Sequence, residues 1–314
     1  MSTRLIRLFL LIAVPLLLIS ISSSWIFEYL WLRELGYTQV FWTLRGAQVI
    51  LTISAFTVAA LYFILNFRYL ASQLSFSNLQ GTPLQGIDMN LSSEFAKKRI
   101  RQAFTLAGLV IALLFAFNFY IRWDESLRFI SSIEFGQVDP LFGNDIGFYL
   151  FQLPFWEVLQ GSLVSIAFFT LAVLVIAYIF TGQFSVESVT KFSGRQAAIR
   201  HITLNAGFWL LLVAFGFFLD RYDLLFDSGG IVYGAGYTDV MIELPAVWIL
   251  FILTLALSAI FFLNRWVNLN RFLPYAAGLI VVVLLLGRAV VPSMVQTFNV
   301  EPNELELETP YLEK

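Results

Sequence analysis

The sequence predicts an all-α fold, a polytopic membrane helix bundle with about seven transmembrane helices. Three observations predict this class. Hydrophobic residues make up 59% of the 314 residues, whereas soluble domains contain about 45–50%. Charged residues make up 13%, about half of the usual share. The mean hydropathy of +0.80 excludes a disordered chain, because such a chain has ample apolar surface to bury.

Seven segments are long and apolar enough to cross a hydrocarbon layer of about 30 Å, which takes about 20 residues. The first could instead be a cleaved signal peptide, since Arg4 and Arg7 precede it and a serine run follows it at 22–24. Its continuation into aromatic residues favours an uncleaved span. Arg288 lies near the end of the last span, where its guanidinium can reach the headgroups. The predicted spans are residues 8–27, 46–67, 103–121, 158–180, 202–219, 246–263 and 272–292.

Lys and Arg are unevenly divided between the two sets of loops. The loops on the side of the N-terminus carry twelve Lys and Arg against three acidic residues, hence a charge of +9. The opposite loops carry seven Lys and Arg against eighteen acidic residues, hence −11. Because cytoplasmic loops are enriched in Lys and Arg, we expect the N-terminus in the cytoplasm and the C-terminus outside the plasma membrane.

The longest cytoplasmic loop, residues 68–102, begins as a turn-rich connector and ends in a basic cluster. The cluster could bind an anionic lipid headgroup, each cation near such a surface contributing about 1 kcal/mol. It could equally serve only as a determinant of topology. Its members are Lys97, Lys98, Arg99 and Arg101.

The external segment 122–157 is too polar to span and too aromatic to lie free in water. Within it, residues 139–156 combine turn signals such as Asp139-Pro140 with six aromatic residues. Such a composition is typical of anchoring at the membrane interface. We therefore predict an interfacial segment between spans three and four, formed by a short pair of interfacial or re-entrant helices.

External carboxylates are the candidate metal ligands. Asp220, Asp223 and Asp227 would share one face of a helix that continues the fifth span, and Ca²⁺ takes several oxygen ligands. Outward-facing acids also follow from the charge asymmetry alone. A second candidate set, Asp139, Asn144 and Asp145, could instead cap turns.

Several kinds of chemistry are excluded. With no cysteine the chain has no disulfide, thiolate nucleophile or Cys-ligated metal. A charge of −2 offers no basic footprint for nucleic acid. The single His201, at the cytoplasmic end of span five, is expected at the interface. The predicted span cores hold no titratable residue, and polar residues such as Asn118 and Asn205 are expected to join helices. We expect no catalytic residue and no cofactor.

Three motifs carry a resemblance. They are DPLFGNDIGFYLFQLPF (139–155), GAGYTDV (234–240) and VQTFNVEPNELELETPYL (295–312). With them the chain resembles the bacterial uncharacterised protein family 0182 of the UPF series. The resemblance implies seven membrane helices followed by a large extracytoplasmic portion, of which this chain would contain only the start. It implies no assigned activity.

Residues 1–292 are expected to form the seven-span domain, and residues 293–314 to begin an extracytoplasmic segment. The preferred function is a membrane anchor or scaffold for an extracytoplasmic domain or partner. The alternative is a transporter or channel for a neutral or lipid-like substrate, which a cavity lined by Asn118, Asn205 and Ser165 would favour. A membrane enzyme ranks third.

Overall fold

The computed structural model of the protein describes residues 3–73, 94–188, 191–227, 234–263 and 273–312. Its long helices are α1 (Thr3–Glu34), α2 (Thr38–Gln73), α3 (Glu94–Ile121), α5 (Leu153–Phe180), α6 (Gln196–Asp220), α7 (Leu244–Leu263) and α8 (Leu273–Leu285). Shorter α-helices are α4 (Trp123–Ile130), α9 (Val291–Val295) and α10 (Glu304–Leu312). The π-helical turns are η1 (Phe148–Gln152), η3 (Asp239–Glu243), η4 (Leu286–Val290) and η5 (Gln296–Val300), and the 3₁₀ turns are η2 (Asp223–Phe226) and η6 (Glu301–Asn303).

Six helices within the described residues are long and apolar enough to cross a membrane. They contain five of the seven predicted spans in full, and the last of them overlaps the predicted span 272–292 from Gly278 onward. The remaining predicted span, residues 8–27, lies inside α1, which is not one of the six. The multi-span helical architecture is therefore confirmed, and the seventh span stays a prediction. The six helices run over Thr38–Gln73, Lys98–Ile121, Phe148–Phe180, Gln196–Asp220, Asp239–Leu263 and Gly278–Asn303.

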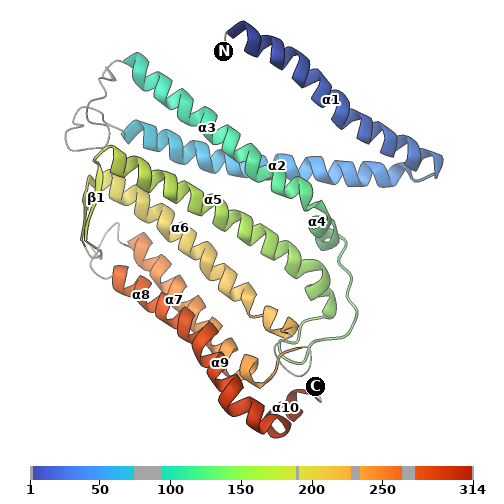
Figure 1. The fold of residues 1–314 in the computed structure, drawn as a ribbon, viewed down its shortest axis with the longest axis vertical. Coiled ribbons are helices and arrows are strands. Elements are labelled where there is room, and N and C mark those ends of the chain that lie inside the picture. Colours follow the sequence, from blue (N-terminus) through green and yellow to red (C-terminus); the bar gives the residue numbers. More distant parts are fainter. Residues whose placement is uncertain (1–2, 74–93, 189–190, 228–233, 264–272, 313–314) are drawn as a thin grey trace.

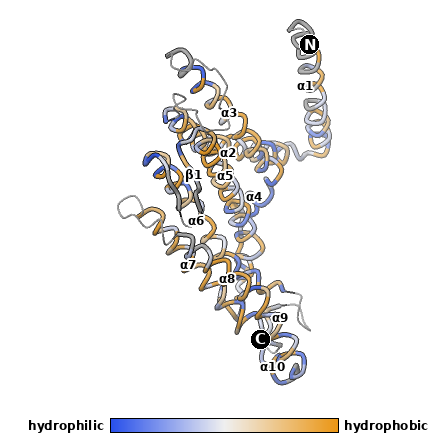
Figure 2. The backbone as a smooth tube through the Cα atoms, turned by 60° about the vertical axis from the view of Figure 1, so that its left-hand side comes forward, coloured by the Kyte–Doolittle hydropathy of each residue, from blue (hydrophilic) through white to orange (hydrophobic). Residues whose placement is uncertain are grey.

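The helices from α2 to α8 pass back and forth between two ends of the bundle, so that successive connections alternate between those ends (Figure 1). A charge asymmetry between two sets of loops requires this alternation, because successive loops must lie at opposite ends of the bundle. Apolar residues predominate along the helices, whereas the hydrophilic α4 and α10 lie at their ends (Figure 2). Helix α1 stands apart from the other helices and approaches α2 at its own C-terminal end (Figure 1). An ion pair between Glu28 and Arg45 joins the two helices there.

Two helix boundaries differ from the sequence prediction. The segment 139–156 is no pair of helices, because 139–145 is not helical and the rest opens the long helix that continues into α5. At the other end of the chain, helix continues past Pro292 as far as Asn303. A proline removes one backbone donor from a helix. The chain nevertheless stays helical around Pro292, with the π-helical turn η4 before it and η5 after it.

A small antiparallel hairpin, β1 (Phe184–Ser188) with β2 (Lys191–Gly194), joins α5 to α6 and was not predicted. Its closing pair is Phe184 with Gly194. A Cβ on Gly194 would lie 2.5 Å from the Gln183 carbonyl oxygen, so the position requires glycine. Just after the hairpin, the Arg195 guanidinium donates a hydrogen bond of 3.3 Å to the Gln73 carbonyl, tying it to the end of α2.

Small residues allow close helix contacts. Ala112 and Ala116 of α3 are fully buried, and a Cβ on Gly108 would touch Phe63 of α2 at 3.3 Å. Between α6 and α7, Ser258 Oγ donates a 2.7 Å hydrogen bond to the Gly207 carbonyl. Such interhelical hydrogen bonds contribute about 0.6 kcal/mol each on average, and close packing does most of the rest.

At the α4 end of the bundle, the Arg221 side chain lies among aromatic rings from three parts of the chain. Its Cζ is 3.9 Å from the ring centre of Phe218, 4.5 Å from Tyr222, 5.1 Å from Trp248 and 5.8 Å from Phe142. A guanidinium over aromatic faces gains about 0.5 to 2 kcal/mol for each favourable contact. This cage joins α6, α7 and the loop that follows α4.

Candidate functional site

The first family-like motif is built around the Asp139 carboxylate. Its Oδ1 accepts hydrogen bonds from the backbone N–H groups of Leu141 (2.9 Å) and Phe142 (2.5 Å). Its Oδ2 accepts from the Asn144 N–H (2.8 Å) and from the Tyr149 hydroxyl (2.6 Å). The carboxylate thus folds the loop 139–144 over the first turn of the η1–α5 helix.

Asp145 does the same for the preceding segment. Its carboxylate accepts hydrogen bonds from the backbone N–H groups of Phe135, Gly136 and Gly147, at 2.7 to 3.1 Å. Gly147 lies so close to the segment that follows α4 that a Cβ there would be 2.1 Å from the Ile133 carbonyl oxygen. The motif therefore needs glycine at position 147 for space.

The pKa values of both carboxyl groups agree with this role. Burial alone would raise the pKa of Asp139, but the hydrogen bonds from Phe142, Tyr149 and the other donors outweigh burial and lower it. The hydrogen bond from Phe135 and those from the neighbouring N–H groups lower the pKa of Asp145. Carboxylates saturated by backbone donors cap turns, which is the alternative that the sequence left open for this set.

The second and third motifs meet at the C-terminal end of the chain. Glu308 of α10 is buried, and its carboxylate accepts hydrogen bonds from the Tyr237 N–H at 3.2 and 3.3 Å. A Cβ on Gly236 would lie 2.9 Å from the same carboxylate. The Thr238 hydroxyl donates a 2.6 Å hydrogen bond to Oε1 of Gln296. We call these contacts the C-terminal latch: Gly236, Tyr237 and Thr238 on one side, and Gln296 and Glu308 on the other.

A pocket of about 240 Å³ lies beside the latch. Its lining is rich in carboxylates and also contains Arg288, whose guanidinium is 2.5 Å from Oδ2 of Asp220. The π-helical turns η3 and η4 both contribute to the lining, and such turns occur frequently at functional sites. The acidic residues that line it are Asp227, Asp239, Glu243 and Glu308.

The predicted calcium ligands do not converge here. Asp220 ends α6 and pairs with Arg288, Asp223 begins the 3₁₀ turn η2, and Asp227 follows that turn. The helix that was expected to align the three side chains ends at Asp220. Within the described ranges, no three acidic or histidine side chains are grouped as metal ligands. The calcium site stays a prediction without support from the geometry.

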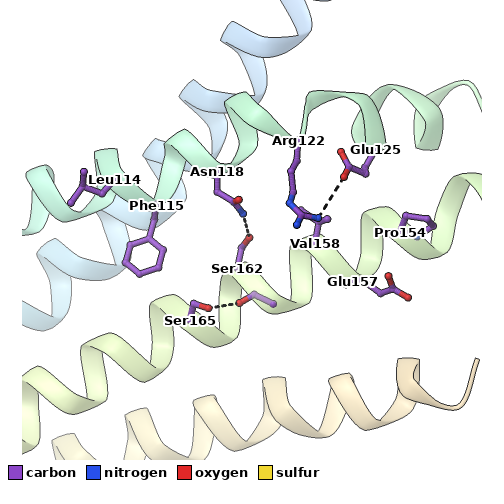
Figure 3. Close-up of a pocket in the computed structure, with 11 residues that line it drawn as sticks. Leu114, Phe115, Asn118, Arg122, Glu125, Pro154, Glu157, Val158, Ser162 and Ser165 are labelled. Carbon is purple, nitrogen blue, oxygen red and sulfur yellow. Dashed lines mark hydrogen bonds and ion pairs between the residues drawn. The ribbon is translucent and has the colours of Figure 1, made fainter. Parts of the chain in front are cut away.

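A larger cavity, of about 590 Å³, lies between α3, α4 and the start of α5 (Figure 3). Asn118 bridges it by donating a 3.1 Å hydrogen bond to Ser162 Oγ. Arg122 and Glu125 form an ion pair of 3.5 Å at one end, and Ser165 lies toward the other (Figure 3). The cavity thus contains two of the three residues expected to line a carrier pathway, Asn118 and Ser165. Asn205 is not among its lining residues.

His201 is buried in α6 rather than placed at the surface. Because Asn66 Nδ2 donates to the Tyr62 carbonyl, its Oδ1 is free to accept from His201 Nε2, at 3.0 Å. The other ring nitrogen, Nδ1, then accepts from the Tyr178 hydroxyl at 3.0 Å. Asn205 extends this network, accepting from the Tyr62 hydroxyl at 2.7 Å and donating to the His201 carbonyl at 3.0 Å.

The network holds α2, α5 and α6 together, and the sequence missed it because His201 lies one residue outside the predicted core of span five. The tautomer of His201, with the proton on Nε2, follows from the acceptor on Asn66, since a neutral imidazole donates from one nitrogen and accepts at the other. His201 is therefore buried between helices near the start of α6, and its position at the membrane interface stays a prediction. The packing role expected for Asn205 agrees with its hydrogen bonds.

The basic cluster opens α3. Lys98, Arg99 and Arg101 are exposed on its first turns, and the side chain of Lys97 lies outside the described residues. Headgroup binding by this cluster stays a prediction. The turn-rich connector at 74–93 and the glycines Gly229 and Gly230 also lie outside the described part of the chain.

The family model described as "Uncharacterised protein family (UPF0182)" matches residues 5–314, which include all three motifs. The chain belongs to the UPF0182 family. Similar UPF0182 proteins occur in Salinibacter ruber (39% identical over 99% of this chain), Trichodesmium erythraeum (31% over 98%) and Bradyrhizobium diazoefficiens (33% over 97%). No solved structure matches the chain.

The chain spans about a third of the length of these UPF0182 relatives: 33% of the Salinibacter protein and 34% of the other two. The family match and the six candidate spans make the chain a multi-span membrane protein with bacterial relatives. Within this UPF0182 chain, the first motif builds a loop and the other two form the C-terminal latch.

Proposed function

We propose that the chain is a membrane anchor that holds the C-terminal portion of UPF0182 proteins, or a partner of that portion, in a fixed position on the bundle. The observation that carries the proposal is the C-terminal latch. Glu308 docks α10 onto the backbone of Tyr237, and Gln296 docks the helix before it onto Thr238. Both contacts lie just before the region where the relatives continue beyond this chain.

The latch suits this purpose because the donor to Glu308 is a backbone N–H, that of Tyr237. A carboxylate that accepts N–H hydrogen bonds contributes about 1.5–3 kcal/mol, and its position is fixed by the fold of the receiving loop. Tyr311 of α10 adds an edge-on ring contact with Tyr237, at 6.3 Å between ring centres.

Replacing Glu308 by leucine is expected to release α10 from the bundle. A loss of about 2 kcal/mol raises the undocked population roughly 30-fold, and cleavage by a protease follows that population when opening is fast. The measurement is the rate of limited proteolysis after Pro292 in the detergent-solubilised protein. Glu306→Leu is the matched control, because Glu306 is exposed on the same helix and its replacement should leave the rate unchanged.

The anchor proposal also predicts that partner association depends on the C-terminal segment. Removal of residues 293–314 should abolish association with any extracytoplasmic partner while the spans remain inserted. Pull-downs from native membranes, with full and truncated chains, measure this. Partners that persist after truncation would contradict the anchor proposal.

We also propose the orientation with the N-terminus in the cytoplasm and the C-terminus outside, with residues 8–27 as a seventh span and residues 139–156 near the outer membrane interface. The support is the charge of +9 against −11 on the two sets of loops. Reporter fusions after Ser77 and Phe192 should behave as cytoplasmic, and fusions after Phe135 and Gly230 as external. An external reporter at Ser77 would refute the orientation.

The second candidate function is a carrier for a neutral or lipid-like substrate, and the cavity beside Asn118 favours it. The two candidates differ in what Asn118→Leu should do. In an anchor, the substitution removes one interhelical hydrogen bond to Ser162 and costs about 0.6 kcal/mol, with no loss of solute uptake. If the substitution alone blocks uptake, the carrier replaces the anchor.

A further inference from the structure

The cavity between α3, α4 and α5 is polar at one end and apolar at the other (Figure 3). Its polar end lies at Arg122, directly after the last residue of α3 and of a candidate span. Its apolar end reaches Leu114 and Phe115, about two turns back along α3, or roughly 10 Å. A lipid in the adjacent membrane leaflet is divided into a polar head and an apolar chain in the same way.

Arg122 supplies the cation at the polar end. Its side chain points from the end of α3 toward α5 and lines the cavity (Figure 3). It is about half exposed and forms an ion pair of 3.5 Å with Oε1 of Glu125. In the part of the chain that the structure describes it donates no hydrogen bond, although a guanidinium carries five N–H donors. Those donors are therefore available to an anionic group.

The two carboxyl groups near Arg122 compete little for this cation. Glu157 turns away from the cavity toward α6 (Figure 3), and its charged neighbours are Asp220 and Asp223. Oε2 of Glu125 is enclosed by the protein, and the ion pair with Arg122 uses Oε1 alone. Burial raises the pKa of the Glu125 carboxyl, because a buried negative charge is costly. An anion that approaches Arg122 therefore meets a weak competitor.

The apolar end is open to the side of the bundle and is not filled by the protein. Leu114, on the wall that α3 forms, is 69% exposed. On the facing helix, a Cβ on Gly161 would meet no atom within 4 Å. Between the two helices, the hydrogen bond from Asn118 to Ser162 crosses the cavity. An acyl chain can thus enter from the bilayer and lie over Gly161.

We propose that the cavity binds an anionic lipid, with the phosphate or carboxylate of its head on Arg122 and the start of an acyl chain over Gly161. The cavity volume of about 590 Å³ lies within the usual range for ligand sites, about 300–1,000 Å³. This site is distinct from the C-terminal latch. It depends neither on the anchor function nor on which side of the membrane is cytoplasmic.

The charged groups favour an anionic head over a zwitterionic one. An anion on Arg122 gains charge-assisted hydrogen bonds, which a guanidinium can donate in pairs. The ammonium of a zwitterionic head would need acceptors of its own, but Glu157 turns away and one oxygen of Glu125 is out of reach. Proteins usually hold a quaternary ammonium in an aromatic cage, whereas Phe115 is the one aromatic residue among those that line the cavity.

The test is native mass spectrometry of the full chain after exposure to vesicles. One arm uses equal parts of phosphatidylglycerol, phosphatidylethanolamine and phosphatidylcholine, and the other uses phosphatidylcholine with oleate. Preferential retention of phosphatidylglycerol in the first arm, or of oleate in the second, supports the proposal and identifies the head as a phosphate or a carboxylate. Retention of zwitterionic lipids at the same level as the anionic lipid in both arms would overturn it.

Arg122→Gln should lower the retention of the anionic lipid about tenfold, on the scale of a charged hydrogen bond. Arg122→Lys should lower it less, because lysine keeps the charge and loses the planar fork. Glu125→Gln should not lower it, since this change removes the carboxylate that competes for Arg122. Arg33→Gln is the matched control and should leave retention unchanged, because Arg33 is exposed in the last turn of α1 and does not line the cavity.

Gly161→Leu should displace the lipid by filling the space at the apolar end while it leaves Arg122 and Glu125 in place. Gly46→Leu is the control for this variant, because a Cβ on Gly46 also meets nothing within 4 Å and Gly46 does not line the cavity. This pair of variants keeps the proposal testable if a substitution of Arg122 prevents folding.

Three further outcomes would overturn the proposal. Undiminished retention in the Gly161→Leu variant would place the lipid elsewhere. Equal losses in the Arg33→Gln and Arg122→Gln variants would show a general attraction of lipids to exposed arginines. Displacement of the retained lipid by soluble glycerol phosphate or acetate at millimolar concentration would show that the head alone is the ligand and that the acyl chain is not held.

Discussion

Replacing Gly147 by alanine is expected to destabilise the protein by about 3 kcal/mol, at the upper end of what overpacking usually costs. The new Cβ would lie 2.1 Å from the Ile133 carbonyl oxygen, and a backbone atom cannot move aside as a flexible side chain does. Moving the segment of Ile133 away from Gly147 would also break the hydrogen bonds that Asp145 accepts from Phe135 and Gly136. Thermal unfolding in detergent, followed by circular dichroism, measures the loss.

Gly46→Ala is the control for this substitution. Gly46 lies in α2, and a Cβ there would meet nothing within 4 Å, so the variant should be as stable as the original or slightly more stable. Gly147 itself has φ −58° and ψ −29°, values that alanine adopts readily, so that backbone strain cannot explain a difference between the two variants. Equal stability of the two variants would show that the loop does not pack as described.

Replacing His201 by leucine should cost about 2 kcal/mol, because it leaves the Tyr178 hydroxyl and Oδ1 of Asn66 without their partner. Buried polar groups that lose their partner each cost about 1–3 kcal/mol, although relaxation in membrane proteins reduces such values. The loss should appear as a lower unfolding temperature in detergent.

A double-mutant cycle with Tyr178→Phe tests whether the loss comes from this network. The double variant should be less destabilised than the sum of the single variants, because each single variant already breaks the bond between Nδ1 and the hydroxyl. Ser165→Ala is a suitable second site outside the network, since its hydroxyl donates to the Gly161 carbonyl of its own helix, and its effect should add independently. Strict additivity with Tyr178→Phe would contradict the network.

Hydropathy predicted the positions of six helices because a span must be apolar over about 20 residues. It did not predict where those helices begin and end. The η1–α5 helix starts at Phe148, ten residues before the predicted span, because aromatic residues that suit an interface also continue a helix. The helix beyond Pro292 was missed because a window that seeks apolar residues cannot detect a π-helical turn.

At the candidate sites, contacts between nearby residues could be predicted from the sequence, whereas contacts between distant residues could not. The turn-capping alternative for Asp139 and Asp145 was available from sequence, because an Asx side chain bonds to backbone groups a few residues away. The pairing of Asp220 with Arg288 spans 68 residues, and the latch from Glu308 to Tyr237 spans 71. No spacing rule connects positions so far apart, and only the packing of α6, α7 and α8 brings them together.

The Arg221 cage has a consequence for how the α4 end of the bundle responds to acid. The Asp139 and Asp145 carboxyls have lowered pKa values, so the stability they contribute is present above their unfolded pKa and is lost as pH falls through the folded one. The rings of Phe142, Phe218 and Trp248, which Arg221 contacts, do not titrate. Acidification would therefore loosen the two carboxylate-capped turns, whereas the contact between Phe142 and Arg221 would remain. That contact would hold the middle of the loop in place, so that the turns could reform once neutral pH returned.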